Sequence, residues 1–173
     1  VDSVCDILEA KPESKFIFFF EHKSVLNKMK EMLRERHPEF DDISITGDIN
    51  SKKREDEKIR YQEDPNCKFA HLTIGAGYAA ITLTAANVVC MVQQPWSPKI
   101  AEQCEDRAHR IGQEKDVSVI YFLSANKFDS YQHRMLTDKS DTSTTTLDGA
   151  RGARFETNKG ADTDAFSSQD AFV

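Results

Sequence analysis

The sequence predicts an α/β fold in which a parallel β-sheet is covered by helices on both faces. Short, continuously apolar runs are typical of strands that are buried on both sides. These runs alternate along the chain with amphipathic or charged segments of helical length. Such alternation favours a parallel sheet, because consecutive parallel strands need a crossover connection between them.

The first half of the chain contains three expected strands and two expected helices. Residues 16–20, Phe-Ile-Phe-Phe-Phe, are apolar throughout and form the first strand. Apolar residues then recur at helical spacing as far as Pro38, at Val25, Leu26, Met29, Met32 and Leu33. A strand, a turn, a charged helix and a further strand are expected at 43–46, 47–50, 51–62 and 68–74.

The second half repeats this alternation. A glycine loop at 75–77 leads into an expected short helix at 79–85, and the apolar run 88–92 is the fourth strand. A helix that starts with a hydroxyl N-cap at Ser97-Pro98, a strand and an amphipathic helix are expected at 98–111, 117–123 and 127–136. Ligands of parallel sheets gather at the carboxyl ends of the strands. We therefore expect one functional edge, formed by the loops 21–24, 47–53, 75–80 and 93–98.

From Lys139 onward the helical pattern gives way to Ser, Thr, Asp, Gly and Ala with isolated Phe residues. This composition is typical of segments that cannot bury enough apolar surface to fold. We therefore divide the chain into a folded domain at 1–138 and a flexible, disordered tail at 139–173.

Composition excludes several classes of protein. The net charge is −6, so any nucleic-acid contact must come from a local basic patch. The four cysteines have no metal-ligand spacing, which favours core thiols in a reducing compartment and no metal site. No apolar stretch is long enough to cross a membrane, and we expect no membrane partner.

Residues 103–113 carry the clearest chemical signal. On the expected helix, Gln103, Arg107 and Arg110 lie on one face, at i, i+4 and i+7. Guanidinium groups bind phosphate oxygens in pairs, and phosphoryl transfer needs positive charge at the γ-phosphate. An alternative is a solvated face whose arginines pair with a neighbouring carboxylate, Glu102 or Asp106.

Two further segments have weaker phosphate-binding patterns. Gly75-x-Gly77-x-x-Ala80 follows a strand and matches the dinucleotide fingerprint in its Ala variant, but no acidic residue ends the next strand. The segment from Gly47 to Arg54 places a turn and a helix start beside three cations, which is also typical of a solvated helix end. The chain contains no G-x-x-x-x-G-K-[ST] phosphate loop, so alone it is not expected to hydrolyse ATP.

Five motifs, in order, resemble the C-terminal RecA-like lobe of the SNF2 group of superfamily 2 ATPases. They are Lys15 to Phe20, Ile45-Thr-Gly47 with Arg54, Leu72 to Asn87, Trp96-Ser-Pro98, and Gln103 to Gln113. The last motif, Gln-x-Glu-Asp-Arg-x-His-Arg-Ile-Gly-Gln, is the most specific. The string Ile-Thr-Leu-Thr-Ala-Ala at 81–86 is similar to the annealing-helicase (HepA-related) branch, and the resemblance covers residues 12–136.

The resemblance implies a nuclear, two-lobed DNA translocase driven by ATP. ATP with Mg²⁺ would bind mainly to an N-terminal RecA-like lobe, and this lobe would add catalytic arginine fingers at Arg107 and Arg110. The nucleotide interface would include Gln103, Gly112 and Gln113. Double-stranded or branched DNA would lie along an edge that corresponds to His22, Lys23, Gly47, Asn50, Arg54, Thr73, Ala76 and Gly77.

Four positions depart from the family pattern. Thr46 and Gln93 stand where acidic residues are common, Ala80 stands in place of Gly, and Ser97 stands in place of Asn. These residues belong to the loops that couple nucleotide to DNA in the family, so the departures put the efficiency of coupling in question.

The function predicted from the sequence is the second motor lobe of a SNF2-type DNA-dependent ATPase, of the chromatin-remodelling or strand-annealing and repair type. A non-catalytic RecA-like module that binds nucleic acid or protein is one alternative. A nicotinamide-binding oxidoreductase, suggested by the glycine loop, is the other.

Overall fold

The computed structural model describes residues 1–77, 81–124 and 127–148. The chain divides into two units, Val1–Leu136 and Thr137–Val173. The first unit contains the whole β-sheet of the described residues. None of the helices in the described ranges combines the length and the apolar character that a membrane span requires.

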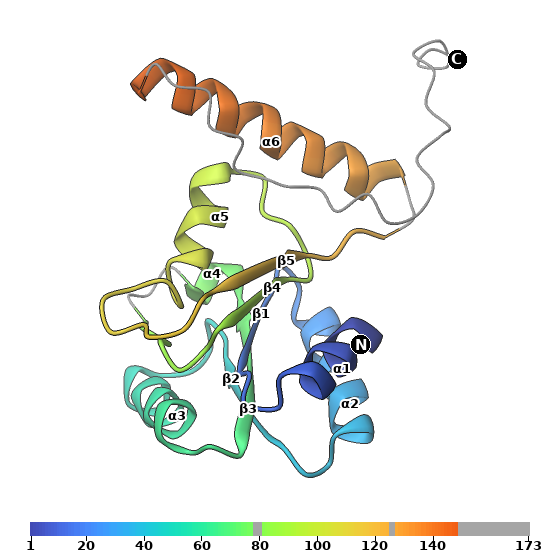
Figure 1. The fold of residues 1–173 in the computed structure, drawn as a ribbon, viewed down its shortest axis with the longest axis vertical. Coiled ribbons are helices and arrows are strands. Elements are labelled where there is room, and N and C mark those ends of the chain that lie inside the picture. The colour runs from blue at the N-terminus through green and yellow to red at the C-terminus, as the bar shows by residue number, and fades with distance from the viewer. Residues whose placement is uncertain (78–80, 125–126, 149–173) are drawn as a thin grey trace. The chain divides into compact units, whose positions relative to one another are not determined.

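Five parallel strands form the sheet in the order β2-β3-β1-β4-β5 (Figure 1). Their bounds are β1 Phe16–Phe20, β2 Asp41–Ile45, β3 Cys67–Thr73, β4 Val88–Met91 and β5 Ser118–Tyr121. The central strand β1 pairs with both β3 and β4, so that Phe16 lies opposite Phe69 on one side and Val88 on the other. The predicted parallel α/β sheet is therefore confirmed.

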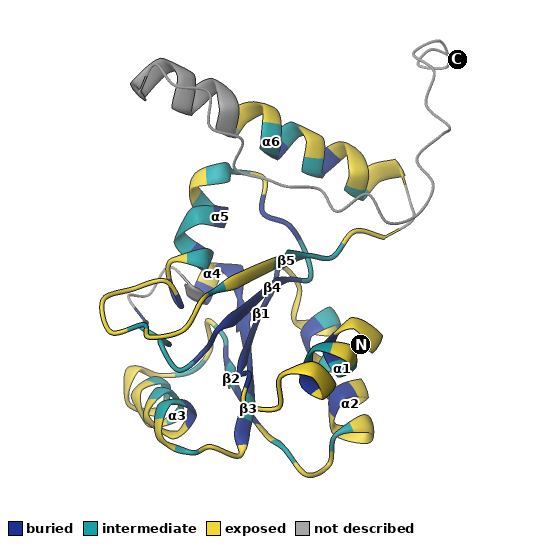
Figure 2. Ribbon diagram, in the orientation of Figure 1, coloured by how far each residue is buried: buried dark blue, intermediate teal, exposed yellow. Residues whose placement is uncertain are grey.

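Helices cover both faces of this sheet (Figure 1). Helices α1 (Asp2–Ala10) and α2 (Lys23–Arg36) pack with Phe16, Phe18 and Phe20. Helices α3 (Ser51–Glu63), α4 (Ile74–Gly77) and α5 (Pro98–Glu105) follow β2, β3 and β4, and residues of all three pack with Ile17 and Phe19. Because side chains alternate along a strand, the apolar run of β1 fills both halves of the core, and all five residues are buried (Figure 2).

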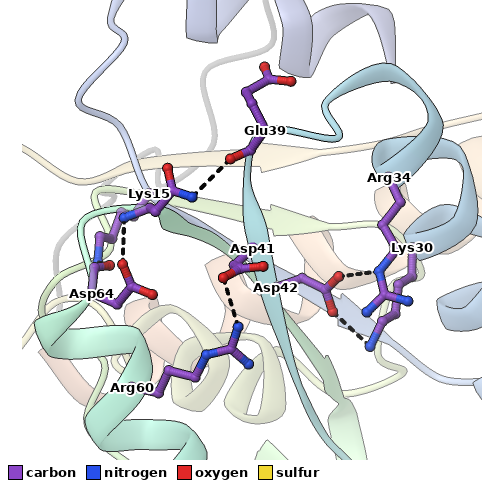
Figure 3. Close-up of polar contacts among 9 residues, drawn as sticks. Lys15, Lys30, Arg34, Glu39, Asp41, Asp42, Arg60 and Asp64 are labelled. Atoms are coloured by element: carbon purple, nitrogen blue, oxygen red, sulfur yellow. Dashed lines mark hydrogen bonds and ion pairs between the residues drawn. The ribbon is translucent and has the colours of Figure 1, made fainter.

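The side chain of Lys15 links the C-terminal end of α3 to the start of β1. Its ammonium donates a hydrogen bond to the carbonyl oxygen of Tyr61 at 2.6 Å and another to that of Asp64 at 2.7 Å (Figure 3 shows the bond to Asp64). Both carbonyls lie at the C-terminal end of α3. The Tyr61 carbonyl would otherwise lack a partner, because residue 65 is a proline without an N–H, whereas the Asp64 carbonyl also accepts from the Cys67 N–H. Burial lowers the pKa of Lys15 from its ordinary value. The Tyr61 hydroxyl donates to the Phe16 carbonyl at 3.1 Å, so the same helix end is bound twice.

Strand β2 forms one edge of the sheet, and charged side chains border it (Figure 3). From α2, Lys30 and Arg34 reach Asp42 at 2.7 and 2.5 Å, and from α3 Arg60 reaches Asp41 at 3.0 Å. Burial alone would raise the pKa of Asp42, but the hydrogen bonds from the two α2 cations hold it below its ordinary value.

The predicted helix at 98–111 is wrong beyond Glu105, where α5 ends. The Arg107 carbonyl accepts a hydrogen bond from the Leu83 backbone N–H at 2.9 Å, so it is already engaged by another segment. The Arg107 side chain also donates to the Gln103 carbonyl at 2.8 Å. The backbone N–H groups of Arg107 and Ala108 bond three residues back, to Cys104 and Glu105, so the α-helix gives way to turns. The two arginines therefore do not lie on one helix face.

Four other predictions differ from the structure. The glycine loop predicted at 75–77 is helical, because β3 passes directly into α4. The predicted helix at 79–85 is wrong at 81–85, which form irregular structure and a turn, and its first two residues lie outside the described ranges. The last helix, α6 (Lys127–Asp148), continues beyond the predicted end at 136, so the prediction of a disordered tail is wrong at 139–148, and the rest of that tail lies outside the described ranges. Helix α1 was not predicted, although Val4 and Leu8 lie four residues apart on one helix face.

Candidate functional site

Residues 106–113, which we call the arginine loop, are held by one glutamine. The Gln113 side-chain amide donates to the carbonyl oxygens of Thr84, Ala86 and Ala108 at 3.0, 2.7 and 3.1 Å. Next to it, Gly112 has φ +98°, in the left-handed region that disfavours any residue with a Cβ. The predicted interface residues Gln113 and Gly112 therefore set the path of the loop backbone.

Arg107 is anchored to the protein's own backbone. Only 7% of the residue is exposed, and its guanidinium donates to the carbonyls of Gln103 at 2.8 Å and Ile81 at 3.4 Å. Burial, and after it the nearby charge of Arg110, lowers the pKa of Arg107 from its ordinary value. Gln103 thus contributes its backbone carbonyl oxygen to the anchoring of Arg107, a contact that the sequence did not indicate.

Arg110 has different surroundings. The residue is exposed, and its guanidinium donates one hydrogen bond, to the Thr82 hydroxyl at 2.9 Å. The described hydrogen bonds of both arginines thus run to the segment 81–82 and the α5 backbone rather than to an acidic neighbour. Of the two predicted fingers, Arg110 is the one whose guanidinium faces solvent.

The segment Ile74–Asn87 joins the arginine loop to the opposite end of the sheet. It begins after the carboxyl end of β3 and ends before the amino end of β4. Its second half holds the arginine loop, through Ile81, Thr82, Leu83, Thr84 and Ala86. Gln62, near the end of α3, binds the same segment. Its side-chain amide nitrogen donates to the Thr84 hydroxyl at 3.1 Å, and its side-chain oxygen accepts from the Ala85 N–H at 2.8 Å.

The threonines of this segment were missed as functional residues. Thr82 and Thr84 alternate within the Ile-Thr-Leu-Thr string, and this alternation of polar and buried residues was the available signal. Their partners, Arg110 and Gln62, are distant in sequence, so no spacing rule could assign them.

The predicted DNA-facing residues lie at the carboxyl ends of β1, β2 and β3. His22 is the N-cap of α2 and Lys23 is its first residue. The Lys23 ammonium forms an ion pair with the Asp48 carboxylate, which brings the loops after β1 and β2 together. The hydrogen bond from Lys23 lowers the pKa of Asp48. The charge of Lys23 is therefore shared with an acidic neighbour.

The turn after β2 contains an unconstrained glycine. Gly47 is exposed, and a Cβ added there would meet no atom within 4 Å, so the fold does not require glycine. Asn50 is the N-cap of α3, and its side-chain oxygen accepts from the Lys53 N–H at 2.8 Å. Arg54 is half-buried, and its Nε has no hydrogen-bond partner among the described residues.

A cavity of about 410 Å³ lies between α2, β2 and α3. Its charged lining is mixed: the acidic residues are Asp42, Asp48 and Glu57, and the basic residues are Lys23, Lys30, Arg34, Lys53 and Arg60. This gathering of cations is a local basic patch within a chain of net charge −6.

The third group of predicted DNA-facing residues is mostly buried. Thr73, the last residue of β3, is 8% exposed, and Ala76 within α4 is 5% exposed. Gly77 ends α4. The side chains of Thr73 and Ala76 therefore offer little surface to a ligand.

Gln93, a departure from the family pattern, accepts two hydrogen bonds. Its side-chain oxygen lies 3.1 Å from the Glu21 N and 3.0 Å from the His22 N, so it orders the loop after β1. A carboxylate would accept the same bonds, so Gln93 keeps the acceptor and loses the charge. Thr46, another departure, donates from its hydroxyl to the Asp48 carboxylate at 3.4 Å. Ala80 lies outside the described residues.

The predicted hydroxyl cap of α5 is wrong. Ser97 occupies the N-cap position and Pro98 the first helical position, but the Ser97 side chain makes no capping hydrogen bond. Its backbone carbonyl instead accepts from the N–H groups of Ile100 and Ala101. Of the two predicted signals for the start of this helix, only the proline at the first helical position is confirmed.

Comparison with known proteins decides the family. The sequence profile described as "Helicase conserved C-terminal domain" matches residues 1–112, more than half of the chain. The chain belongs to this family. The helicase C-terminal domain was the assignment predicted from the ordered motifs, and it is confirmed.

Two relatives place this helicase C-terminal domain among SNF2-related proteins. It is 33% identical over 141 residues to the Drosophila melanogaster "SWI/SNF-related matrix-associated actin-dependent regulator of chromatin subfamily A-like protein 1", covering 80% of this chain and 18% of the relative. It is 34% identical over 137 residues to the Mus musculus "DNA annealing helicase and endonuclease ZRANB3", covering 79% of this chain and 13% of the relative. The predicted resemblance to the annealing-helicase branch is thus confirmed, for a chain that spans under a fifth of these relatives.

A solved structure shows the same fold. The C-terminal part of the Fun30 ATPase domain matches the helicase C-terminal domain with a TM-score of 0.72 and 23% identity, over 78% of this chain and 44% of that chain. At this identity the likeness establishes the RecA-like arrangement of strands and helices.

Proposed function

We propose that this helicase C-terminal domain is the second motor lobe of a SNF2-type, DNA-dependent ATPase that translocates on double-stranded or branched DNA. One observation carries the proposal. Arg110 presents an exposed guanidinium on a loop whose backbone is fixed by Gln113 and Gly112. A fixed, unshielded cation beside a nucleotide is the arrangement that phosphoryl transfer requires, because charge accumulates on the γ-phosphate oxygens.

ATP is the substrate in this proposal, and its Mg²⁺ and phosphates are held mainly by an N-terminal RecA-like lobe. Arg110 reaches the γ-phosphate as a catalytic residue. Arg107, also a catalytic residue by motif, uses the donors that remain after its bonds to Gln103 and Ile81. Residues Gln103, Gly112 and Gln113 hold this interface. An arginine finger contributes about 10³ to 10⁵ in rate in related hydrolases.

On the DNA side, we propose that the carboxyl edge of the sheet binds phosphates. Lys23 and Arg54 supply charge, while His22 and Asn50 present helix N-termini whose backbone N–H groups attract anions. The open space above Gly47 allows a backbone phosphate to approach the turn closely. Thr73, Ala76 and Gly77 contribute main-chain atoms, since the first two side chains are buried.

The segment Ile74–Asn87 supports coupling between the two sites. Its first residues follow the DNA-facing end of β3, and its last residues bind the arginine loop. A shift of this segment on DNA binding would therefore change the position of Arg110. The relative named as a DNA annealing helicase is consistent with strand annealing as the output, and with a nuclear location. We retain 1–138 as the motor domain and 139–173 as the tail.

The decisive test replaces Arg110 in the intact two-lobed protein. Arg110→Ala is expected to lower the DNA-stimulated ATPase rate by about 10³-fold or more, while DNA binding is retained. Arg134→Ala is the matched control, because Arg134 is an exposed arginine on α6. A variant that hydrolyses ATP at the wild-type rate would overturn the assignment of Arg110 as an arginine finger. An intact wild-type protein without DNA-stimulated ATPase activity would favour the non-catalytic binding module instead.

A further inference from the structure

A second cluster of reactive side chains lies where α1 meets the C-terminal end of α2. The Cys5 Sγ lies 3.2 Å from the His37 Nε2, and the His37 Nδ1 lies 3.2 Å from the Glu39 Oε1. Cys5 is half-buried, whereas the other three thiols, Cys67, Cys90 and Cys104, are buried. A thiol, an imidazole and a carboxylate in this order are the parts of an activated nucleophile.

The imidazole of His37 is held in place by its neighbours. Its ring packs against Phe40 and Phe69, with centroids 6.0 and 6.2 Å away. His37 is also the C-cap of α2, and its backbone N–H donates to the Leu33 carbonyl at 2.8 Å. With the Nδ1 proton donated to Glu39, the Nε2 lone pair is directed at the thiol, so that His37 can accept its proton.

A guanidinium completes the surroundings of the sulfur. The Arg36 Nη1 lies 3.8 Å from the Cys5 Sγ and also forms an ion pair with Asp2. The Cys5 sulfur therefore has both an imidazole nitrogen and a guanidinium nitrogen within 4 Å. Across the described ranges no three His, Cys, Asp or Glu side chains converge as metal ligands, so the geometry fits a nucleophile better than a metal centre.

We propose that Cys5 is a redox-reactive thiol that hydrogen peroxide oxidises to a sulfenic acid, with His37 as the base. His37 Nε2 takes the thiol proton, and the thiolate attacks one peroxide oxygen. The O–O bond breaks as the S–O bond forms, and the leaving hydroxide takes the proton back from His37 as water. Sulfur is oxidised by two electrons and peroxide is reduced by two. Glu39 orients His37 as a positioning residue.

This modification site is independent of the motor proposal. Cys5 and His37 lie on the α1 and α2 side of the sheet, whereas the arginine loop packs on α5 and the segment before β4. Oxidation would remove the sulfur's contact with His37, which links α1 to the end of α2.

The test treats the 173-residue chain with hydrogen peroxide at neutral pH, traps sulfenic acid with dimedone and quantifies each cysteine by mass spectrometry. Cys5 is expected to label at least about tenfold faster than free glutathione under the same conditions. Cys67 and Cys104 are internal controls, because burial raises their pKa to about 11 and about 12. Labelling of Cys5 no faster than that of glutathione would overturn the proposal.

Variants of His37 and Glu39 test whether Cys5 reacts because His37 removes its proton or only because its sulfur is accessible. His37→Gln is expected to slow Cys5 labelling by about tenfold or more, since the base is lost. Glu39→Gln should slow it less, and Glu35→Gln, the same change at an exposed site on α2, should leave it unchanged. If His37→Gln unfolds the chain, the buried thiols label as well, and Glu39→Gln then decides. Wild-type labelling rates in a folded His37→Gln or in Glu39→Gln would contradict the role of His37.

Discussion

Two arginines of one motif have different surroundings, which is the main lesson at the scale of single residues. Arg107 is bound to backbone carbonyls and Arg110 is exposed. Their order and spacing could be predicted from the sequence, but their burial could not. It depends on the Leu83 N–H and the Ile81 carbonyl, which come from a segment more than twenty residues earlier.

The ion pair between Lys23 and Asp48 leads to two opposite predictions. Lys23→Ala should weaken DNA binding for all sequences and reduce its salt dependence, because one phosphate contact is lost. Asp48→Asn should tighten DNA binding, because it releases Lys23 from its carboxylate partner. Titration of a fluorescent duplex at several salt concentrations measures both. Equal affinities for wild type and Asp48→Asn would show that Lys23 does not compete between Asp48 and phosphate.

His71 gives a prediction about pH. It is fully buried on β3, stacked on Phe18, and burial lowers its pKa from 6.5 to about 3, against the opposing charge of Asp42 and with a smaller lowering by Lys30 and Arg34. As pH falls below 6.5, the unfolded chain binds a proton at His71 that the folded chain does not. The free energy of unfolding therefore decreases by up to about 1.4 kcal/mol per pH unit.

Replacement of His71 by Phe should remove this contribution. Urea denaturation of wild type and His71→Phe between pH 6.5 and pH 5 measures the two slopes. The wild-type stability should fall more steeply than that of the variant. Parallel slopes would mean that His71 is protonated in the folded state over this range.

At the scale of elements, strands were predicted better than helices. All five strands were located. The signal is clearest for β1, β3 and β4, because their residues are almost all buried, whereas the residues of β5 are exposed or half-buried. The end of α5 was missed, since it is set by the Leu83 N–H on the Arg107 carbonyl rather than by helix propensity. The candidate site was likewise predicted only in part. Its motifs are short segments that the sequence shows directly, whereas Gln62, Thr82 and Gln93 form hydrogen bonds with residues that are distant in sequence.

Among the side chains that hold the arginine loop, Gln113 makes the largest number of described hydrogen bonds. Gln113→Leu removes the amide that serves three carbonyls, so we expect the free energy of unfolding to fall by about 1 to 3 kcal/mol. Urea denaturation measures this loss, and Glu114→Gln, at the exposed neighbouring position, is the control. In the intact protein Gln113→Leu should also lower the ATPase rate. Unchanged stability would mean that water replaces the amide without cost.

At the scale of the whole molecule, we propose that the chain supplies half of a catalytic site. The 173-residue chain is expected not to hydrolyse ATP, with or without DNA, because no phosphate loop is present in its sequence. It should still bind duplex DNA weakly, and high salt should abolish this binding because the contacts are to phosphates. A phosphate-release assay and a salt titration test these two expectations. DNA-stimulated hydrolysis by the chain alone would contradict the two-lobed arrangement.

The charged side chains along β2 bear on whether copies of this protein aggregate through the edges of their sheets. An edge strand has one row of backbone N–H and C=O groups without a neighbouring strand, and such a row is a template for aggregation. Lys30, Arg34 and Arg60 gather at this edge (Figure 3). Cationic side chains repel their counterparts on an identical edge, so two molecules are kept from joining their sheets. The same residues that stabilise Asp41 and Asp42 therefore also protect the protein from polymerising.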